Sequence, residues 1–234
     1  MRRIGAAVAA LFFAAAAVAA AATEVCDQTM GLKVCYTDNG GPAGYDHPIL
    51  GGTPEWRDLR GPDWVLRFQA GFFEDIAPRV ADVTGDGRPE VIAVQTDLRR
   101  GARLIVVAGD GKLLGATAYI GQRHRWMAQA GLGDFDGDGR IEIAYVDRPH
   151  LAKELVFLRL EAGDLREVAR ISGLTNHRIG DKAISGGTRH CDGKDQIILA
   201  SGDWRRILAV QIGQTSRDLG PYSRAAMRAA LTCQ

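Results

Sequence analysis

Acidic side chains recur at a fixed spacing in a glycine-rich segment in the middle of the chain. Carboxylates occupy its first, third, fifth and ninth positions, at Asp134, Asp136, Asp138 and Glu142. Calcium takes six to eight oxygen ligands in a flexible geometry, and a tight loop can bring alternate side chains to one point. The main-chain carbonyl of Arg140, at the seventh position, would add a further oxygen. The spacing therefore predicts a calcium site in this segment.

The same frame occurs 52 residues earlier and, in a weaker form, 54 residues later. The earlier copy offers five oxygen ligands: Asp82, Thr84, Asp86, the carbonyl of Arg88, and Glu90. Because Thr84 provides a neutral oxygen, we expect this copy to bind calcium more weakly. The later copy has Thr188, His190, Asp192 and Gln196 at the corresponding positions, and we expect no calcium there.

Two other interpretations of the acidic segments are open to the sequence. They could be Asp/Gly turns without metal, but converging carboxylates would then repel one another. An EF-hand loop also has this start, but it needs flanking helices and a glutamate at position 12, where this chain has Tyr145.

Each acidic segment runs directly into an apolar strand, at 91–94, 143–146 and 197–200. A loop that recurs about every 50 residues before a strand is typical of a β-propeller. Four-strand units can be placed over 73–121, 124–171 and 177–219, with a shorter first unit over 45–68. These features predict an all-β fold, a small propeller of four or five blades built from ~52-residue repeats, ending in a short helical tail at 223–231. A β-sandwich with two calcium loops is the competing fold.

Residues 65–215 resemble the FG-GAP or VCBS-type repeats of integrin α-like β-propellers. The resemblance rests on D-x-D-x-D-G-x-x-[DE], which 134–142 matches fully and 82–90 matches except at Thr84. It implies a propeller with Ca²⁺ in the loops between the first and second strands of the blades. It implies no enzymatic activity.

The N-terminal sequence and the cysteines indicate export. Residues 1–22 have the basic start, apolar run and small-residue end of a signal peptide, with a membrane anchor as the alternative. We expect residues 23–44 to be irregular and tethered by a disulfide, and 45–234 to form the propeller domain. The even cysteine count favours two disulfides, Cys26–Cys35 and Cys191–Cys233, over free thiols or a thiolate metal site. The second would hold the C-terminal strand near the point where the ring of blades closes.

A second candidate site comes from residues at equivalent places before the inner strands. In a propeller these strand starts surround one mouth of the central channel, so their side chains would meet there. The candidate site residues are His47, Asp75, His124, Arg125, Trp126, His177 and Arg178. Imidazoles with a carboxylate could bind a transition metal or an anion. Alternatively, the histidines cap the strand starts of their own blades through hydrogen bonds to the backbone.

The sequence predicts an exported, calcium-binding propeller, periplasmic or extracellular, that acts as a binding or interaction module for a protein or a small ligand. A propeller enzyme, a hydrolase or lyase working in the histidine-lined channel, and a structural envelope protein are the alternatives. Lys and Arg total 29 and Asp and Glu total 28, without a long basic run, so we expect no nucleic-acid partner. We also expect a monomer with no membrane span once the signal is removed.

Overall fold

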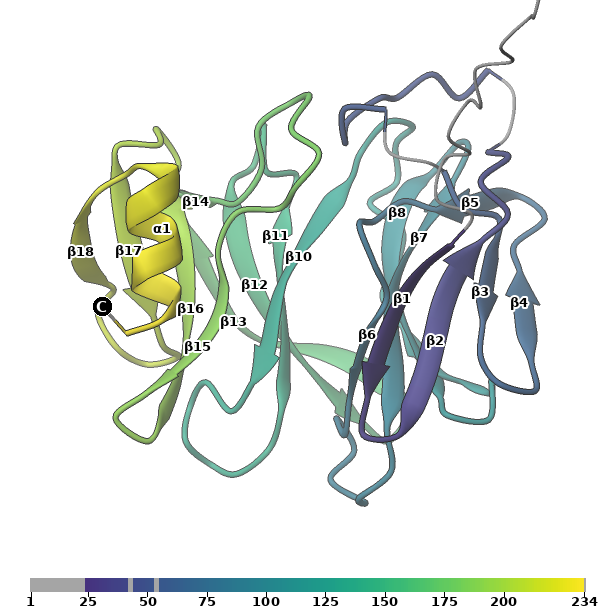
Figure 1. Cartoon of the computed structure of the whole chain (residues 1–234), viewed down its shortest axis with the longest axis horizontal. Helices are drawn as coiled ribbons and strands as arrows, with labels where there is room; N and C mark the ends of the chain where they lie inside the picture. Colours follow the sequence, from purple (N-terminus) through teal and green to yellow (C-terminus); the bar gives the residue numbers. More distant parts are fainter. Residues whose placement is uncertain (1–23, 42–43, 53–54, 234) are drawn as a thin grey trace, which may run out of the picture.

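The computed structural model describes residues 24–41, 44–52 and 55–233, so the expected signal peptide lies outside the described residues. The described chain forms four antiparallel sheets in sequence order and one short helix (Figure 1). The all-β prediction is confirmed, and the four sheets have the make-up of propeller blades. None of the described helices is long and apolar enough to cross a membrane.

Each sheet is an up-and-down array that starts from an inner strand. The first contains β1 (Glu24–Thr29), β2 (Leu32–Thr37), β3 (Asp58–Arg60) and β4 (Val65–Arg67). The second contains β5 (Gly71–Phe73), β6 (Arg79–Ala81), β7 (Glu90–Asp97), β8 (Gly101–Ala108) and β9 (Leu113–Ala116). The third contains β10 (Met127–Gly133), β11 (Glu142–Asp147), β12 (Glu154–Glu161) and β13 (Asp164–Ser172). The fourth contains β14 (Leu174–Thr175), β15 (Gly187–Cys191), β16 (Lys194–Ser201), β17 (Arg206–Val210) and β18 (Arg217–Pro221).

The acidic loops join the first two strands of a blade, as the resemblance implied. Residues 82–89 connect β6 to β7, and residues 134–141 connect β10 to β11. In the second sheet the inner strand is divided, since β5 and β6 both pair with β7. In the third sheet the single strand β10 carries a register shift between Gln129 and Gly131.

An apolar cluster fills each interface between successive sheets. Strand β7 is buried along its whole length and contributes to two of them. Val91 and Ala93 pack toward the first sheet, whereas Ile92 and Val94 pack toward the third. Successive side chains of a strand point to opposite faces, so a sheet covered on both sides has a continuously apolar sequence rather than an alternating one.

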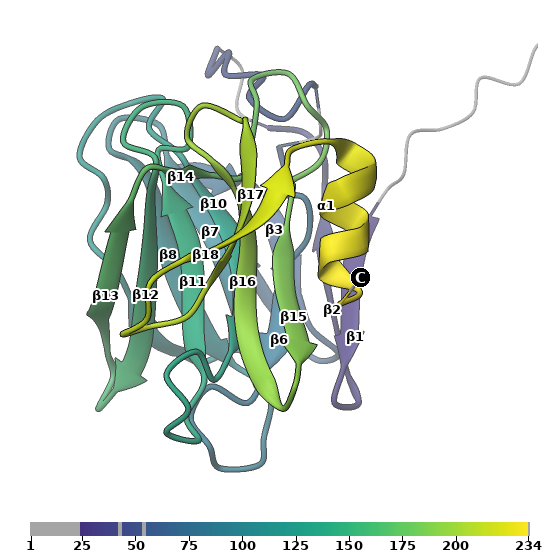
Figure 2. The ribbon, with the colours of Figure 1, turned by 90° about the vertical axis from the view of Figure 1, so that its left-hand side faces the viewer.

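The helix α1 (Arg224–Leu231) covers the outer face of the fourth sheet (Figure 2). Ser223 caps its first turn by accepting a hydrogen bond from the Ala226 amide. Met227 and Ala230 pack on Ile198 and Ala209. The predicted helical tail is thus confirmed.

The predicted Cys191–Cys233 disulfide is present and ties the end of the helix to β15. Its expected part in ring closure is corrected by the structure. In the described chain no strand of the first sheet pairs with the fourth. The apolar face of the fourth sheet is covered by α1 instead, so the bond fastens this covering helix to its own blade.

The expectation of an irregular segment over 23–44 is also corrected. Residues 24–37 form the β1–β2 hairpin and belong to the first sheet. The turn uses Met30 (φ +52°) and Gly31 (φ +79°), two left-handed residues that suit a two-residue hairpin connection. Cys26 and Cys35 are directly opposite in the register and form the second disulfide that we predicted.

Candidate functional site

The loop between β10 and β11 gathers three carboxylates. Asp134, Asp136 and Asp138 each offer an oxygen, and these oxygens lie within 4.8 Å of one another. Asp134 fixes the loop by accepting hydrogen bonds from the amides of Gly137 (2.7 Å), Asp138 (3.1 Å) and Gly139 (2.9 Å). Both glycines have positive φ, of +82° and +86°, which a side chain would disfavour. Backbone amides of the loop therefore hold the Asp134 carboxylate in its place in the predicted cluster.

Glu142, at the start of β11, closes the inner side of this loop. Its side chain is fully buried and accepts a hydrogen bond from the Phe135 amide (2.8 Å). Burial raises the pKa of Glu142, and the hydrogen bond from Arg159 opposes that rise. On the outer side, hydrogen bonds from the Arg140 side chain lower the pKa of Asp138. The cluster offers carboxylate oxygens, which calcium prefers as ligands, so these side chains fit this ion.

Arg159, on β12, is a part of the site that sequence reasoning missed. Its side chain is 7% exposed and lies 2.9 Å from Asp136 Oδ2 and 3.3 Å from Asp138 Oδ2. It also donates to Glu142 Oε1. The guanidinium neutralises part of the acidic charge and competes for the oxygens that a metal would use. Its signal in the sequence was an arginine in an otherwise apolar strand, but only the β11–β12 register brings it to Glu142.

The loop between β6 and β7 has the same backbone frame without the arginine. Asp82 accepts from the amides of Gly85 (2.7 Å), Asp86 (3.1 Å) and Gly87 (2.7 Å). Glu90 accepts hydrogen bonds from the amides of Val83 and Thr84. The residue opposite Glu90 on β8 is Ala108, so no arginine faces it there. Of the described acidic loops, 134–138 forms a cluster of three carboxylates and 82–90 does not.

The fourth repeat contributes to the third loop rather than repeating it. Asp195 accepts a hydrogen bond from the Asp134 amide (2.9 Å) and lies 2.8 Å from His190 Nδ1. The remnant of the motif thus holds the neighbouring blade's loop in place.

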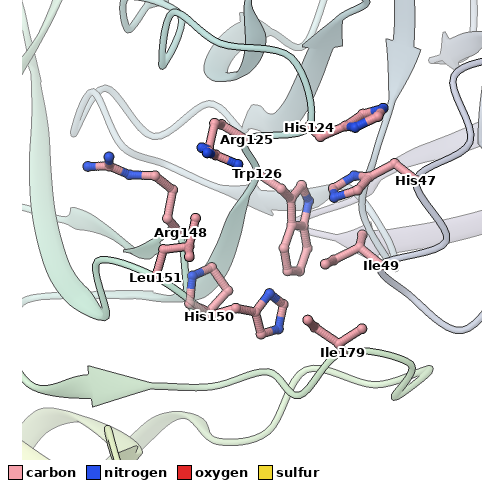
Figure 3. Close-up of a pocket in the computed structure, with 10 residues that line it drawn as sticks. His47, Ile49, His124, Arg125, Trp126, Arg148, His150, Leu151 and Ile179 are labelled. Atoms are coloured by element: carbon pink, nitrogen blue, oxygen red, sulfur yellow. The ribbon is translucent and has the colours of Figure 1, made fainter.

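The structure brings together part of the predicted histidine site. His47 and His124 stack with ring centroids 5.0 Å apart and an interplanar angle of 7°. Both line a cavity of about 270 Å³ together with Arg125 and Trp126 (Figure 3). His177 is buried behind His150, with His150 Nε2 3.1 Å from His177 Nδ1.

Two predicted members lie elsewhere. Asp75 is fully buried and is not part of the cavity lining; it accepts a hydrogen bond from Gln129 Nε2 (2.6 Å), and burial raises its pKa. Arg178 stacks on Trp204, 4.2 Å from the ring centroid, outside the cavity lining. The carboxylate at the histidines is instead Glu74, whose Oε1 lies 2.8 Å from His47 Nδ1.

His47 and His124 do not cap their own blades, whereas His177 Nε2 lies 2.8 Å from the carbonyl of Asp181 in its own blade, as the capping interpretation expects. His47 contacts Glu74 of the second sheet, and His124 Nε2 lies 2.6 Å from the carbonyl of Tyr45, in the β2–β3 loop. These contacts join different blades at the cavity. Sequence reasoning missed His150, which follows β11 in the loop 148–153; burial and the neighbouring His177 lower its pKa to about 4, so it is neutral at pH 7.

Comparison with known protein families identifies an FG-GAP-like repeat in this chain. A search of curated proteins found no match. Among solved structures, the crystal structure of rhamnogalacturonan lyase YesW is similar, with 16% identity and a TM-score of 0.44. The match covers 86% of this chain and 50% of that one, so the chain spans about half its length. The model of the FG-GAP-like repeat family matches residues 82–145, which include both acidic loops. The chain therefore carries an FG-GAP-like repeat, and the resemblance seen in the sequence is confirmed.

Proposed function

We propose that this protein is an exported calcium-binding β-propeller that acts as a binding or interaction module. The observation that carries the proposal is the cluster of Asp134, Asp136 and Asp138, with Glu142 at its inner side. Bound there, calcium would supply positive charge that holds the β10–β11 connection rigid. The two disulfides support export, because such bonds persist in oxidising compartments.

The chain's own residues prepare the loop for a cation. The amides of Gly137 and Gly139 fix the Asp134 carboxylate, so little conformational entropy remains to be lost on binding. The second loop, 82–90, has the same preorganised frame with fewer carboxylates. We propose that it binds calcium more weakly than 134–142.

Thermal unfolding in EGTA and in millimolar calcium tests the proposal. A ligand that binds only the native state at a hundredfold excess over its dissociation constant adds roughly 2.7 kcal/mol to the unfolding free energy. Asp138→Asn should remove most of the calcium-induced rise in Tm. Asp164→Asn is a matched control, since its side chain is 76% exposed and lies outside the loops. Equal midpoints for the wild-type protein in EGTA and calcium would contradict the calcium role.

A further inference from the structure

The cavity at the histidines lies at the opposite edge of the sheets from the acidic loops. Residues 124–126 precede β10 and residues 148–151 follow β11, whereas the acidic loop joins the other ends of the same two strands. The β2–β3 loop contributes His47 and Ile49, and the loop after β14 contributes Ile179. Figure 3 shows His47, Trp126 and Ile179 facing one space, whereas the Arg148 side chain extends away from it. The cavity is therefore separate from the calcium loops and is built from three sheets.

Arg125 gives this cavity a positive charge that forms no ion pair with an acidic side chain of the described chain. Its side chain is half-buried, and within the described residues it makes no hydrogen bond or ion pair. The second arginine in the lining, Arg148, is paired with Asp147 at 2.7 Å. A partly desolvated guanidinium without a partner favours an anion.

The imidazoles offer hydrogen bonds rather than a metal site. His47 and His124 are nearly parallel, so their in-plane nitrogen lone pairs cannot converge on one ion. His47 Nδ1 is engaged by Glu74, and His124 Nε2 by the Tyr45 carbonyl. In the described chain His47 Nε2 and His124 Nδ1 make no hydrogen bond, so each of these rings has one nitrogen left for a ligand. No described group of three metal-ligating side chains includes these histidines.

The rest of the lining is apolar and open. Trp126 is buried and points its Nε1 away, donating to the Glu74 carbonyl at 2.7 Å. Leu151 and Ile179, 61% and 72% exposed, stand at the rim, and Gly180 donates to the Ile49 carbonyl at 3.2 Å, which fixes one side. The volume of about 270 Å³ is slightly below the roughly 300 Å³ at which pockets for drug-sized molecules start, so the cavity suits a small ligand.

We propose that this cavity binds a small organic carboxylate, with the carboxylate held by Arg125 and an apolar or ring-shaped body packed against Trp126 and the rim aliphatics. The single unpaired arginine matches a monoanion better than a phosphate dianion, because Asp147 already neutralises Arg148. This proposal deepens the binding role proposed above, and it does not depend on calcium.

The test uses benzoate as the probe, with benzamide as its neutral isostere and inorganic phosphate as a competing anion. Calorimetric titration gives the affinities, and the indole N–H resonance of Trp126 reports the place of binding. We expect benzoate to shift this resonance and to bind at least tenfold more tightly than benzamide or phosphate. Arg125→Gln should weaken benzoate at least tenfold, and Leu151→Ala, at the exposed rim, should weaken it without affecting folding. Arg166→Gln, whose side chain is 62% exposed on β13, should leave it unchanged.

Titrations in EGTA and in calcium separate this proposal from the calcium role. Benzoate binding in both conditions, with no calcium-dependent change in Tm, would contradict only the calcium role. No benzoate binding, equal affinity for benzamide, or full affinity in Arg125→Gln would overturn the carboxylate site. Zinc binding that disappears in His47→Ala and His124→Ala would also overturn it, because the imidazoles would then serve a metal.

Discussion

Replacing Arg159 by glutamine should make the stability of the protein depend more strongly on calcium. The guanidinium is almost completely buried against Asp136, Asp138 and Glu142. Removing one partner of a buried ion pair costs about 3–5 kcal/mol, because the remaining charge is left uncompensated. Glu142 keeps its hydrogen bond from the Phe135 amide, so we expect the lower end, about 3 kcal/mol, when calcium is absent. For a domain of this size, that is a fall of about 6–12 °C in Tm.

Calcium should restore part of this loss. In the variant the ion no longer competes with a guanidinium for the carboxylates of Asp136 and Asp138, so we expect tighter binding. Where a given calcium concentration is a hundredfold excess over the dissociation constant of the wild type and a thousandfold excess over that of the variant, calcium adds about 2.7 kcal/mol to the first and about 4.1 kcal/mol to the second. The difference in stability between wild type and Arg159→Gln should therefore fall from about 3 kcal/mol in EGTA to about half of that in calcium.

Urea denaturation followed by circular dichroism, in EGTA and in calcium, measures both differences. Arg166→Gln is the control for removing an arginine from the same blade, and it should change stability by less than about 1 kcal/mol. An equal loss for Arg159→Gln in both conditions would show that Arg159 does not share its ligands with the ion. Unchanged stability in EGTA would refute the account of the buried pair.

Three further predictions concern other parts of the molecule. The pKa of His150 is about 4 when folded and about 6.5 when unfolded, so the unfolded chain binds more protons between these values and the unfolding free energy should fall as pH drops from 6.5 to 4. Urea denaturation at several pH values should show that the unfolding free energy of His150→Gln depends less on pH than that of the wild type. An equal pH dependence in both proteins would contradict this. Non-reducing peptide mapping should find Cys191 joined to Cys233, and replacing both by serine should cost about 4 kcal/mol and increase amide exchange in α1; a Cys35–Cys233 peptide would contradict the assignment. Gly139→Ala should cost about 1 kcal/mol because φ is +86° and should weaken calcium binding in calorimetry, and an unaltered affinity would show that the loop tolerates another conformation.

The sequence predicted the features that depend on local spacing. The acidic frame repeats because one loop must connect the first two strands of each blade, and its glycines supply the positive φ that Asp134 requires. The apolar strands, the terminal helix and the Cys26–Cys35 pair are equally local. Each involves residues within one turn, one hairpin or one strand, so a short stretch of sequence contains the physical reason for it.

Tertiary structure decided which neighbours those local units meet. Arg159 reaches Glu142 only through the register of β11 with β12, which no loop motif encodes. Glu74 rather than the adjacent Asp75 meets His47, because the chain after β5 directs Asp75 to Gln129 instead. Likewise, α1 covers the fourth sheet where we expected the ring to close. The repeats are thus determined by short-range sequence, whereas the charge balance of the acidic loop and the lining of the cavity arise from packing between segments distant in the chain.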